Sequence, residues 1–210
     1  MPTSILAKTV TFPPVTSSNL ENLPPPRLPL TEPLQGGQKI HNHLRLMDQG
    51  TKYFLEQLAA LPPSGTRPVT TLAYAQSLDG SLTRTPGSPT RISSEESLTF
   101  THQLRSAHDA ILVGIGTVLS DNPRLNVGRV PGKNPRPVIM DSKLRTPLDA
   151  NLLSSHPEPW IATTQDACPD KTKAFESRGV KVIQVTSLPN GWVDPVALQA
   201  LLVERGVNSL

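Results

Sequence analysis

The residues best suited to chemistry follow a short apolar run at residues 110–113. A run of this length and β-branched content is typical of a buried strand rather than a helix. Gly114 and Gly116 come next at a spacing that favours a tight turn, and Thr117 opens a short segment that closes at Asp121. A strand followed by glycines, a hydroxyl and a carboxylate is how α/β proteins form the edge of a nucleotide pocket. The sequence therefore predicts a nucleotide site here.

The glycine pattern differs from the dinucleotide-binding fingerprint G-x-G-x-x-G. Its third glycine would fall at position 119, which is Leu119. Taken alone, Asp121 is also consistent with a turn cap before Asn122, and Thr117 with a residue that begins a helix. The site hypothesis therefore depends on residues elsewhere in the chain.

The sequence does not support a disulfide, a metal site or zinc-dependent deamination. Cys168 is the single cysteine, which excludes an intrachain disulfide and a multi-cysteine metal site. His41 and His43 form an H-x-H pair, but no third ligand stands at a plausible spacing, so no metal site is predicted. Zinc-dependent deaminases combine H-x-E with P-C-x-x-C, and the single cysteine excludes the second motif, so this chain is not expected to be the deaminase. Asp79, at the end of a predicted strand, is a candidate proton donor, although Asp-Gly is more typical of a turn.

The elements that must position these residues alternate between strands and helices. Ser93 and Glu96 form a capping box that predicts a helix start, and Asp194 with Pro195 predicts another. This alternation predicts a mostly parallel sheet with helices on both faces. Predicted strands occupy residues 69–75, 110–113, 137–140, 160–163 and 180–185; predicted helices occupy residues 93–107, 170–178 and 194–206; and residues 207–210 look like the start of another strand.

Composition divides the chain into two parts. With 23 prolines in 210 residues and only 36% hydrophobic residues, the chain mixes an ordered region with a poorly ordered one. We predict a proline-rich, largely disordered extension at residues 1–66, with one or two short helices between residues 40 and 61, and an ordered domain at residues 67–210.

Charge and hydropathy limit the partners that we expect. The net charge is +3, but the basic residues are scattered singly, so a nucleic-acid partner is not predicted. No apolar run approaches the roughly 18 residues that span a bilayer. The N-terminus lacks the layout of a secretory signal, so we expect a cytoplasmic protein. An organellar transit peptide is the alternative, because the first twenty residues are acid-free and rich in hydroxyls.

Several blocks of residues 67–210 occur in an order that is typical of one enzyme family. They are TLAYAQSLDG (71–80), THQLR (101–105), HDAILVGIGT (108–117), DNPRLN (121–126), PRPVIMDS (135–142) and LR (144–145). With these blocks, residues 67–210 resemble the reductase domain of the riboflavin-biosynthesis reductase family, both the C-terminal domain of the bifunctional deaminase/reductase and the stand-alone diaminohydroxyphosphoribosylaminopyrimidine reductases. The resemblance implies a dihydrofolate-reductase-like three-layer fold, usually dimeric. It also implies NADPH-dependent reduction of the ribosylamino side chain of a pyrimidine 5′-phosphate to ribitylamino.

The resemblance also implies roles for individual residues. The expected cofactor contacts are Ala75, Gly114, Gly116, Thr117, Asp121 and Ser142. The expected substrate contacts are Asp121, Asn122 and Leu125. The family arginine that meets the substrate phosphate falls at Gly128, so Arg129 is its expected replacement. No residue is assigned as the proton donor.

The resemblance predicts a further segment after the last residue. The family continues with a glycine-rich E-G-G turn and a helix that bind the NADPH phosphates, which would begin just after Leu210. We therefore expect the fold to be incomplete at its C-terminus. The alternative function is a truncated or split, non-catalytic form of the reductase that holds NADPH weakly, because backbone N–H donors supply much of dinucleotide affinity.

Overall fold

The computed structural model describes residues 6–12, 49–61, 65–77, 80–82 and 92–210. The chain divides into two compact units, Met1–Phe12 with Pro63–Leu210, and Pro13–Pro62. The described part of the second unit contains a helix at residues 49–60, within the segment where the apolar pattern predicts helical pieces. No helix among the described residues is long and apolar enough to cross a membrane.

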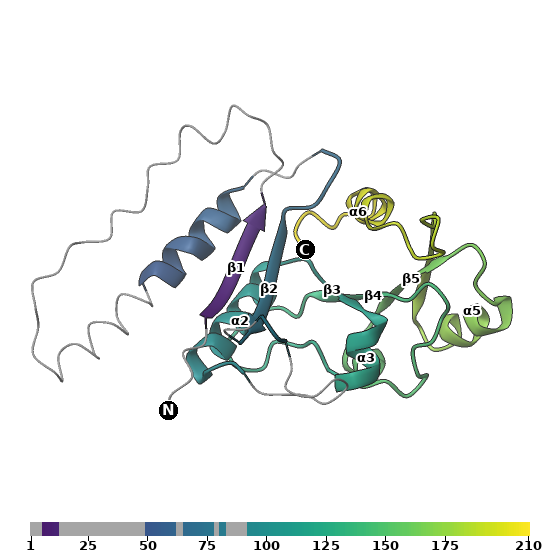
Figure 1. The fold of residues 1–210 in the computed structure, drawn as a ribbon, viewed down its shortest axis with the longest axis horizontal. Helices are drawn as coiled ribbons and strands as arrows, with labels where there is room; N and C mark the ends of the chain where they lie inside the picture. The colour runs from purple at the N-terminus through teal and green to yellow at the C-terminus, as the bar shows by residue number, and fades with distance from the viewer. Residues whose placement is uncertain (1–5, 13–48, 62–64, 78–79, 83–91) are drawn as a thin grey trace, which may run out of the picture. The chain divides into compact units, whose positions relative to one another are not determined.

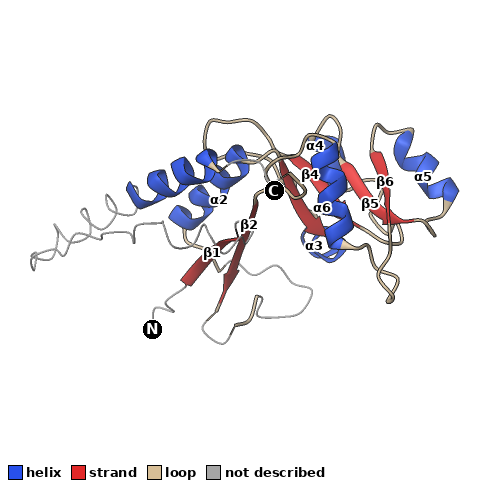
Figure 2. Ribbon diagram, turned by 90° about the horizontal axis from the view of Figure 1, so that it is seen from above, coloured by secondary structure: helices blue, strands red, loops and turns tan. Residues whose placement is uncertain are grey.

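A four-stranded parallel sheet forms the centre of the first unit. Its strands are β3 (Ala110–Gly114), β4 (Arg136–Met140), β5 (Trp160–Thr164) and β6 (Lys181–Val185), in the order β3-β4-β5-β6. Figure 2 shows β4, β5 and β6 side by side. Since neighbouring strands are consecutive and parallel, all four carboxyl ends lie at one edge of the sheet. The predicted parallel sheet is confirmed.

Helices cover both faces of this sheet, which gives three layers. One face packs against α6 (Pro195–Glu204), and the other against α3 (Ile115–Asp121), α4 (Asn151–Ser155) and α5 (Pro169–Glu176). The division follows the side-chain alternation of a strand, because neighbouring residues of β4 enter opposite layers. The first layer contains Val138, Trp160, Ala162, Ile183, Leu198 and Leu202; the second contains Val118, Ile139, Leu152, Ile161, Phe175 and Val180.

Two strands at the start of the unit form an antiparallel pair. They are β1 (Leu6–Phe12) and β2 (Thr70–Gln76). No strand was expected within residues 1–66, and this part of the prediction is wrong. The proline-rich composition of the whole segment concealed a short proline-free stretch of β-forming residues between Pro2 and Pro13.

Residues 208–210 connect this pair to the four-stranded sheet. The Val69 N–H donates to the carbonyl of Asn208, and the Leu210 N–H to the carbonyl of Val69, both at 2.8 Å. The Ala110 N–H donates to the carbonyl of Ser209 at 3.2 Å. The predicted strand start after residue 207 is therefore confirmed as a parallel bridge to Val69, and Figure 1 shows the C-terminus beside β2.

Asp109 fixes the same residues from the side of β3. One oxygen of its carboxylate, Oδ2, accepts hydrogen bonds from the N–H groups of Asn208 and Ser209, both at 2.9 Å, and from Ser209 Oγ at 3.0 Å. Residues 208–210 and Asp109 together form what we call the strap, which joins β2 to β3.

The helix caps agree with the sequence except at one position. Helix α2 (Glu95–Ala107) is capped by Ser94, whose Oγ accepts the Ser97 N–H at 3.2 Å, and not by Ser93. Asp194 caps α6 as predicted, since its carboxylate accepts the N–H groups of the first turn. Gly179 follows the end of α5 with a φ of 78°, which only glycine adopts readily.

Candidate functional site

Two hollows lie beside β3 and share α3, which follows the carboxyl end of that strand, the edge where ligands bind in parallel α/β sheets. The first, about 390 Å³, is lined by β2, α2, β3 and α3, and we call it the β2–β3 hollow. The second, about 730 Å³, is lined by the β3–α3 junction, the loop after β4 and residues 188–195, and we call it the β4-loop hollow. Both volumes are in the range of small-molecule sites. Helix α3 contributes residues to both linings.

A third hollow, about 520 Å³, lies at the opposite edge of the sheet, where β3 and β4 begin. Its lining mixes charges of both signs. Arg136 forms an ion pair with Glu158 at 3.2 Å and lies over the ring of Trp160. This hollow also lies at the edge opposite to the one where ligands bind in parallel α/β sheets, so the first two hollows are the better candidates.

The connection from β3 to α3 differs from the predicted tight glycine turn. Gly114 has an extended backbone (φ −77°, ψ 155°) and caps α3, which begins at Ile115 rather than at Thr117. Neither Gly114 nor Gly116 has a left-handed φ, and a Cβ built on either meets no atom within 4 Å. The protein's own conformation and packing therefore do not require these glycines. Both line the β4-loop hollow, so they leave room there for a ligand.

Thr117 and Asp121 lie four residues apart on α3 and therefore share one face of the helix. Both line the β2–β3 hollow and are exposed. The Asp121 carboxylate accepts a hydrogen bond from Ser120 Oγ at 2.7 Å. The hollow thus has a hydroxyl and a carboxylate on one side and the apolar side chains of β2 and β3 on another.

Arg105 on α2 lines the same hollow, and it is the one arginine or lysine among the described residues of this lining. Its Nη1 donates to the carbonyl of Asn126 at 3.1 Å, whereas its buried Nε has no hydrogen-bond partner among the described residues. Burial lowers the pKa of the Arg105 guanidinium from its usual range, yet an arginine stays protonated in proteins. A half-buried guanidinium in the lining of a hollow is suited to bind an anion.

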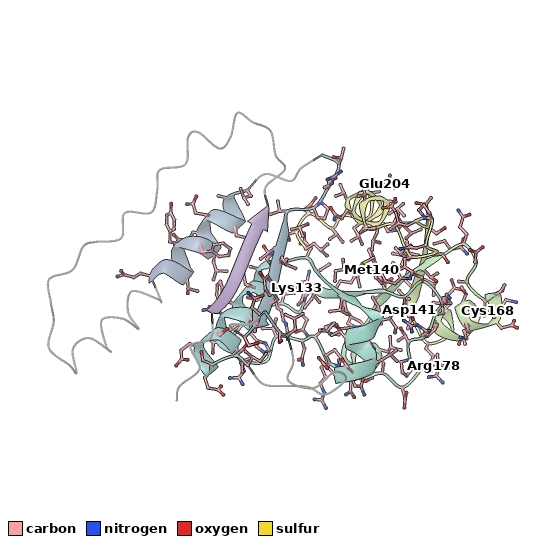
Figure 3. All side chains as sticks on the ribbon, viewed as in Figure 1. Lys133, Met140, Asp141, Cys168, Arg178 and Glu204 are labelled. Atoms are coloured by element: carbon pink, nitrogen blue, oxygen red, sulfur yellow. The ribbon has the colours of Figure 1, made fainter. Side chains whose placement is uncertain are left out.

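The loop after β4 is held tightly. The carboxylate of fully buried Asp141 accepts the Thr146 N–H at 2.7 Å and Thr146 Oγ1 at 2.8 Å. Ser142 is fixed on both sides, because its Oγ accepts the Val193 N–H at 2.9 Å and its carbonyl accepts the hydroxyl of Thr164 at 3.0 Å. Figure 3 shows Met140 and Asp141 where β4 ends, away from Lys133, which precedes the strand.

The comparisons with known proteins agree with this architecture. The family model described as RibD C-terminal domain matches residues 68–210, more than half of the chain. The chain belongs to this family. It is 36% identical over 154 residues to the 2,5-diamino-6-ribosylamino-4(3H)-pyrimidinone 5′-phosphate reductase of Archaeoglobus fulgidus, an alignment that covers 69% of this chain and 68% of that protein.

Two further relatives come from yeasts. The reductase of the same name from Debaryomyces hansenii is 45% identical over 113 residues, which cover 47% of this chain and 44% of that protein. The solved structure of the riboflavin biosynthesis reductase Rib7 from Saccharomyces cerevisiae matches with a TM-score of 0.60 and 30% identity, over 78% of this chain and 69% of that one. The dihydrofolate-reductase-like α/β fold implied by the resemblance is therefore confirmed.

The chain spans only part of several relatives. The alignments cover 44%, 36% and 56% of the length of the reductases from D. hansenii, S. cerevisiae and Methanothermobacter thermautotrophicus.

Not all the residues expected from the RibD C-terminal domain family reach the hollows. Thr117, Asp121 and Leu125 line the β2–β3 hollow, and Gly114, Gly116 and Ser142 line the β4-loop hollow. Ala75 lies on β2, beyond the residues of that strand that line the β2–β3 hollow. Asp79 lies outside the described residues.

Asn122 and Arg129 are engaged elsewhere. Asn122, in the left-handed conformation at the end of α3, accepts the Asn151 N–H on its Oδ1 at 2.8 Å and so ties α3 to α4. Arg129 forms an exposed ion pair with Glu95 and lines neither hollow. The sequence pattern favoured Arg129 because it is adjacent to the family position, but Arg105 is the arginine inside the hollow. The block THQLR, which contains Arg105, was the available signal.

Proposed function

We propose that this chain is an NADPH-dependent reductase that converts the ribosylamino side chain of a pyrimidine 5′-phosphate to ribitylamino. The observation that supports it best is the pair of hollows that share α3 at the carboxyl end of β3. A dinucleotide and a second, smaller molecule need two connected spaces of this size. The relatives named above carry this reductase name.

The residues of the β4-loop hollow fit a dinucleotide. The open space at Gly114 and Gly116 lets a ligand approach the backbone closely. Ser142 presents a hydroxyl on a loop that Asp141 and Thr146 hold rigid. Bound NADPH would supply the hydride that the reduction requires. The protein's contribution is to hold the nicotinamide against the sugar carbon in a site that excludes water.

The residues of the β2–β3 hollow fit the substrate. We infer that Arg105, rather than Arg129, binds the 5′-phosphate, because Arg105 lines this hollow and Arg129 does not. Thr117 and Asp121 line the β2–β3 hollow on α3, which also contributes to the β4-loop hollow, and they are proposed to contact the reacting ends of cofactor and substrate. The acceptor also needs a proton when it takes the hydride, which water would deliver.

Reduction by the full chain tests this proposal directly. The loss of NADPH is followed spectroscopically with 2,5-diamino-6-ribosylamino-4(3H)-pyrimidinone 5′-phosphate and with its deaminated analogue as substrates. We expect Arg105→Lys to lower kcat/KM roughly 10- to 100-fold, because lysine keeps the charge but loses the planar donor set. Arg129→Ala should stay within about threefold, as exposed ion pairs contribute little.

A dephosphorylated substrate separates phosphate binding from general damage. If Arg105 acts on the phosphate, wild-type protein and Arg105→Lys should use the dephosphorylated substrate equally poorly. Equal losses on both substrates would instead mean that Arg105 supports the fold through Asn126. Failure of the wild-type chain to oxidise NADPH with either substrate would contradict the proposed function. A homodimer and a cytoplasmic location stay predictions.

A further inference from the structure

The loop that follows α3 is fastened to α2 by two side chains of that helix. Arg105 Nη1 donates to the carbonyl of Asn126 at 3.1 Å. The Gly128 N–H donates to His102 Nδ1, also at 3.1 Å. Both bonds join a helix side chain to the backbone of the loop, so they fix the path of the chain itself. We call residues 126–128 the α2-bound loop.

Other contacts keep the same segment in place. The Val127 N–H donates to Asn134 Oδ1 at 2.7 Å, which ties the start of the segment to its end. Gly132 lies so close to α2 that a Cβ built on it would clash with Ser106 Cβ. Only glycine permits this approach of the backbone to the helix. The segment is therefore docked along the C-terminal half of α2.

The α2-bound loop supports one wall of the β2–β3 hollow. Leu125, which precedes it, is buried, lines the hollow and has a left-handed φ of 56°. This conformation is unfavourable for leucine, so the contacts around it must hold it there. Arg105 lines the same hollow while its Nη1 is bonded to Asn126. His102 does not line the hollow, so any effect it has there passes through the loop.

The bond from Gly128 to His102 depends on the protonation state of the ring. Nδ1 accepts the N–H, so it carries no proton, and the neutral ring has its proton on Nε2. A second proton on Nδ1 would replace the acceptor with a donor that faces the N–H of Gly128. The hydrogen bond is then lost, and two positive groups face each other.

The surroundings of His102 decide when this happens. Burial, followed by the charges of Arg105 on α2 and Arg129 on the loop, lowers the pKa of His102 below its usual value of 6.5, and a backbone hydrogen bond with Asn126 opposes this. Arg129 is itself paired with Glu95. The ring is therefore neutral at neutral pH, and it takes up its proton only as the pH falls through the lowered pKa.

We propose that His102 is a positioning residue for the β2–β3 hollow: its neutral ring holds the α2-bound loop against α2, and its protonated ring releases the loop. Release frees the backbone next to Leu125 and the anchor of Arg105, so the hollow binds its ligand more weakly in acid. The inference rests on the proposed function for the identity of that ligand, the pyrimidine 5′-phosphate.

Amide hydrogen exchange at Gly128, followed by NMR, tests the hold on the loop without any ligand. Each rate is divided by the intrinsic rate at the same pH, which leaves the protection. We expect protection in the wild type at about pH 7.5 and a roughly three- to tenfold loss by about pH 5. His102→Leu removes the acceptor and should lack this protection at both pH values. His102→Asn should keep it at both, because its Oδ1 accepts in place of Nδ1 and does not titrate.

The pH dependence of KM links the loop to the hollow. The substrate phosphate also titrates, near pH 6, so each variant is compared with the wild type at the same pH. At about pH 7.5 the wild type and His102→Asn should have similar KM values for the pyrimidine phosphate; at about pH 5 the wild-type KM should be roughly threefold or more higher, with similar kcat. Gln103→Leu, at the next position of α2, is the matched control and should follow the wild type.

Several outcomes would overturn the inference. They are equal protection of Gly128 in the wild type and His102→Leu, an acid-induced loss of protection that His102→Asn also shows, and a KM that varies with pH identically in the wild type and His102→Asn. Thermal unfolding verifies that the variants fold. If no form oxidises NADPH with the pyrimidine, the proposed function is contradicted, and exchange at Gly128 still decides whether His102 holds the loop.

Discussion

Two glycines of this fold differ in what they contribute: Gly116 leaves space at a hollow, and Gly179 adopts a left-handed backbone conformation. Alanine substitutions at the two positions should therefore have different effects. A Cβ at Gly116 meets open space in α3, so Gly116→Ala should leave the free energy of unfolding unchanged or raise it by up to about 1 kcal/mol. The same methyl group should weaken NADPH binding if a ligand approaches the backbone there. Denaturant unfolding and NADPH titration of one variant measure both effects.

Gly179→Ala is the matched control for this prediction. Gly179 has a φ of 78°, so alanine there should cost about 1 kcal/mol of stability without changing NADPH affinity. If Gly116→Ala instead binds NADPH as tightly as the wild type, Gly116 has no role in the cofactor site.

At the scale of residues, the sequence predicted the part of the site that lies on one continuous segment. Thr117 and Asp121 reach the same hollow because a helix brings positions four apart onto one face. The arginine that lines the β2–β3 hollow was harder to predict. Adjacency in sequence favoured Arg129, but α2 places the half-buried Arg105 in the lining of the hollow, whereas Arg129 pairs with Glu95 outside it. Which arginine lies in the hollow depends on tertiary contacts, and a local sequence pattern does not contain these.

Among the elements, α2 is joined to β2 through a partly buried histidine that follows the helix. His108 Nδ1 lies 2.6 Å from the carbonyl of Leu104, so it carries the proton, and Nε2 accepts from Thr71 Oγ1 at 2.9 Å. Burial lowers the pKa of His108 below its usual value of 6.5. The neutral ring is therefore the native form, and the junction is sensitive to acid.

The pKa of His108 predicts how stability depends on pH. The unfolded chain takes up the proton first as the pH falls below about 6.5, so the free energy of unfolding should decrease there. The decrease stops once the pH is below the lowered native pKa, because both states are then protonated. His108→Gln should show a shallower decrease between about pH 8 and pH 5, measured by denaturant midpoints.

The free energy of unfolding of His108→Gln should still decrease somewhat as the pH falls. His102 also has a pKa lowered by burial and by the nearby charges of Arg105 and Arg129. An identical pH dependence in wild type and His108→Gln would show that His108 is not protonated on unfolding in this range.

At the scale of elements, the sequence predicted those with strong local signals. Asp194 and Pro195 mark the start of α6, and Gly179 marks the stop after α5. Each of these signals acts on the backbone within one helical turn, so it can be recognised in the sequence. The start of α2 was displaced by one residue, since Ser93 and Ser94 are equally good caps by type. Strand β1 was missed because its hydrogen bonds come from β2, more than fifty residues away in sequence.

In the molecule as a whole, the strap joins the β1–β2 pair to the four-stranded sheet. Asp109→Ala removes the acceptor for two N–H groups and a hydroxyl. We expect faster hydrogen exchange at the amides of Val69, Thr71 and Ala110, each of which donates to residues 208–210. Amides in β5 and β6 should exchange as in the wild type.

Asp149→Ala removes another exposed aspartate and should alter none of these rates. Unchanged exchange at Val69, Thr71 and Ala110 in Asp109→Ala would show that the backbone bonds alone hold the strap in place.

The strap also sets an order of folding. Strands β3 to β6 are neighbours in both sequence and space, so each closes a short loop when it pairs. Asp109 and Ser209 are 100 residues apart, and β2 gains its bonds to the strap only after that much chain has been made and arranged. During synthesis the four-stranded sheet therefore forms around an open edge at β3. Until residues 208–210 arrive, that edge is the place where a nascent chain would pair with the wrong strand.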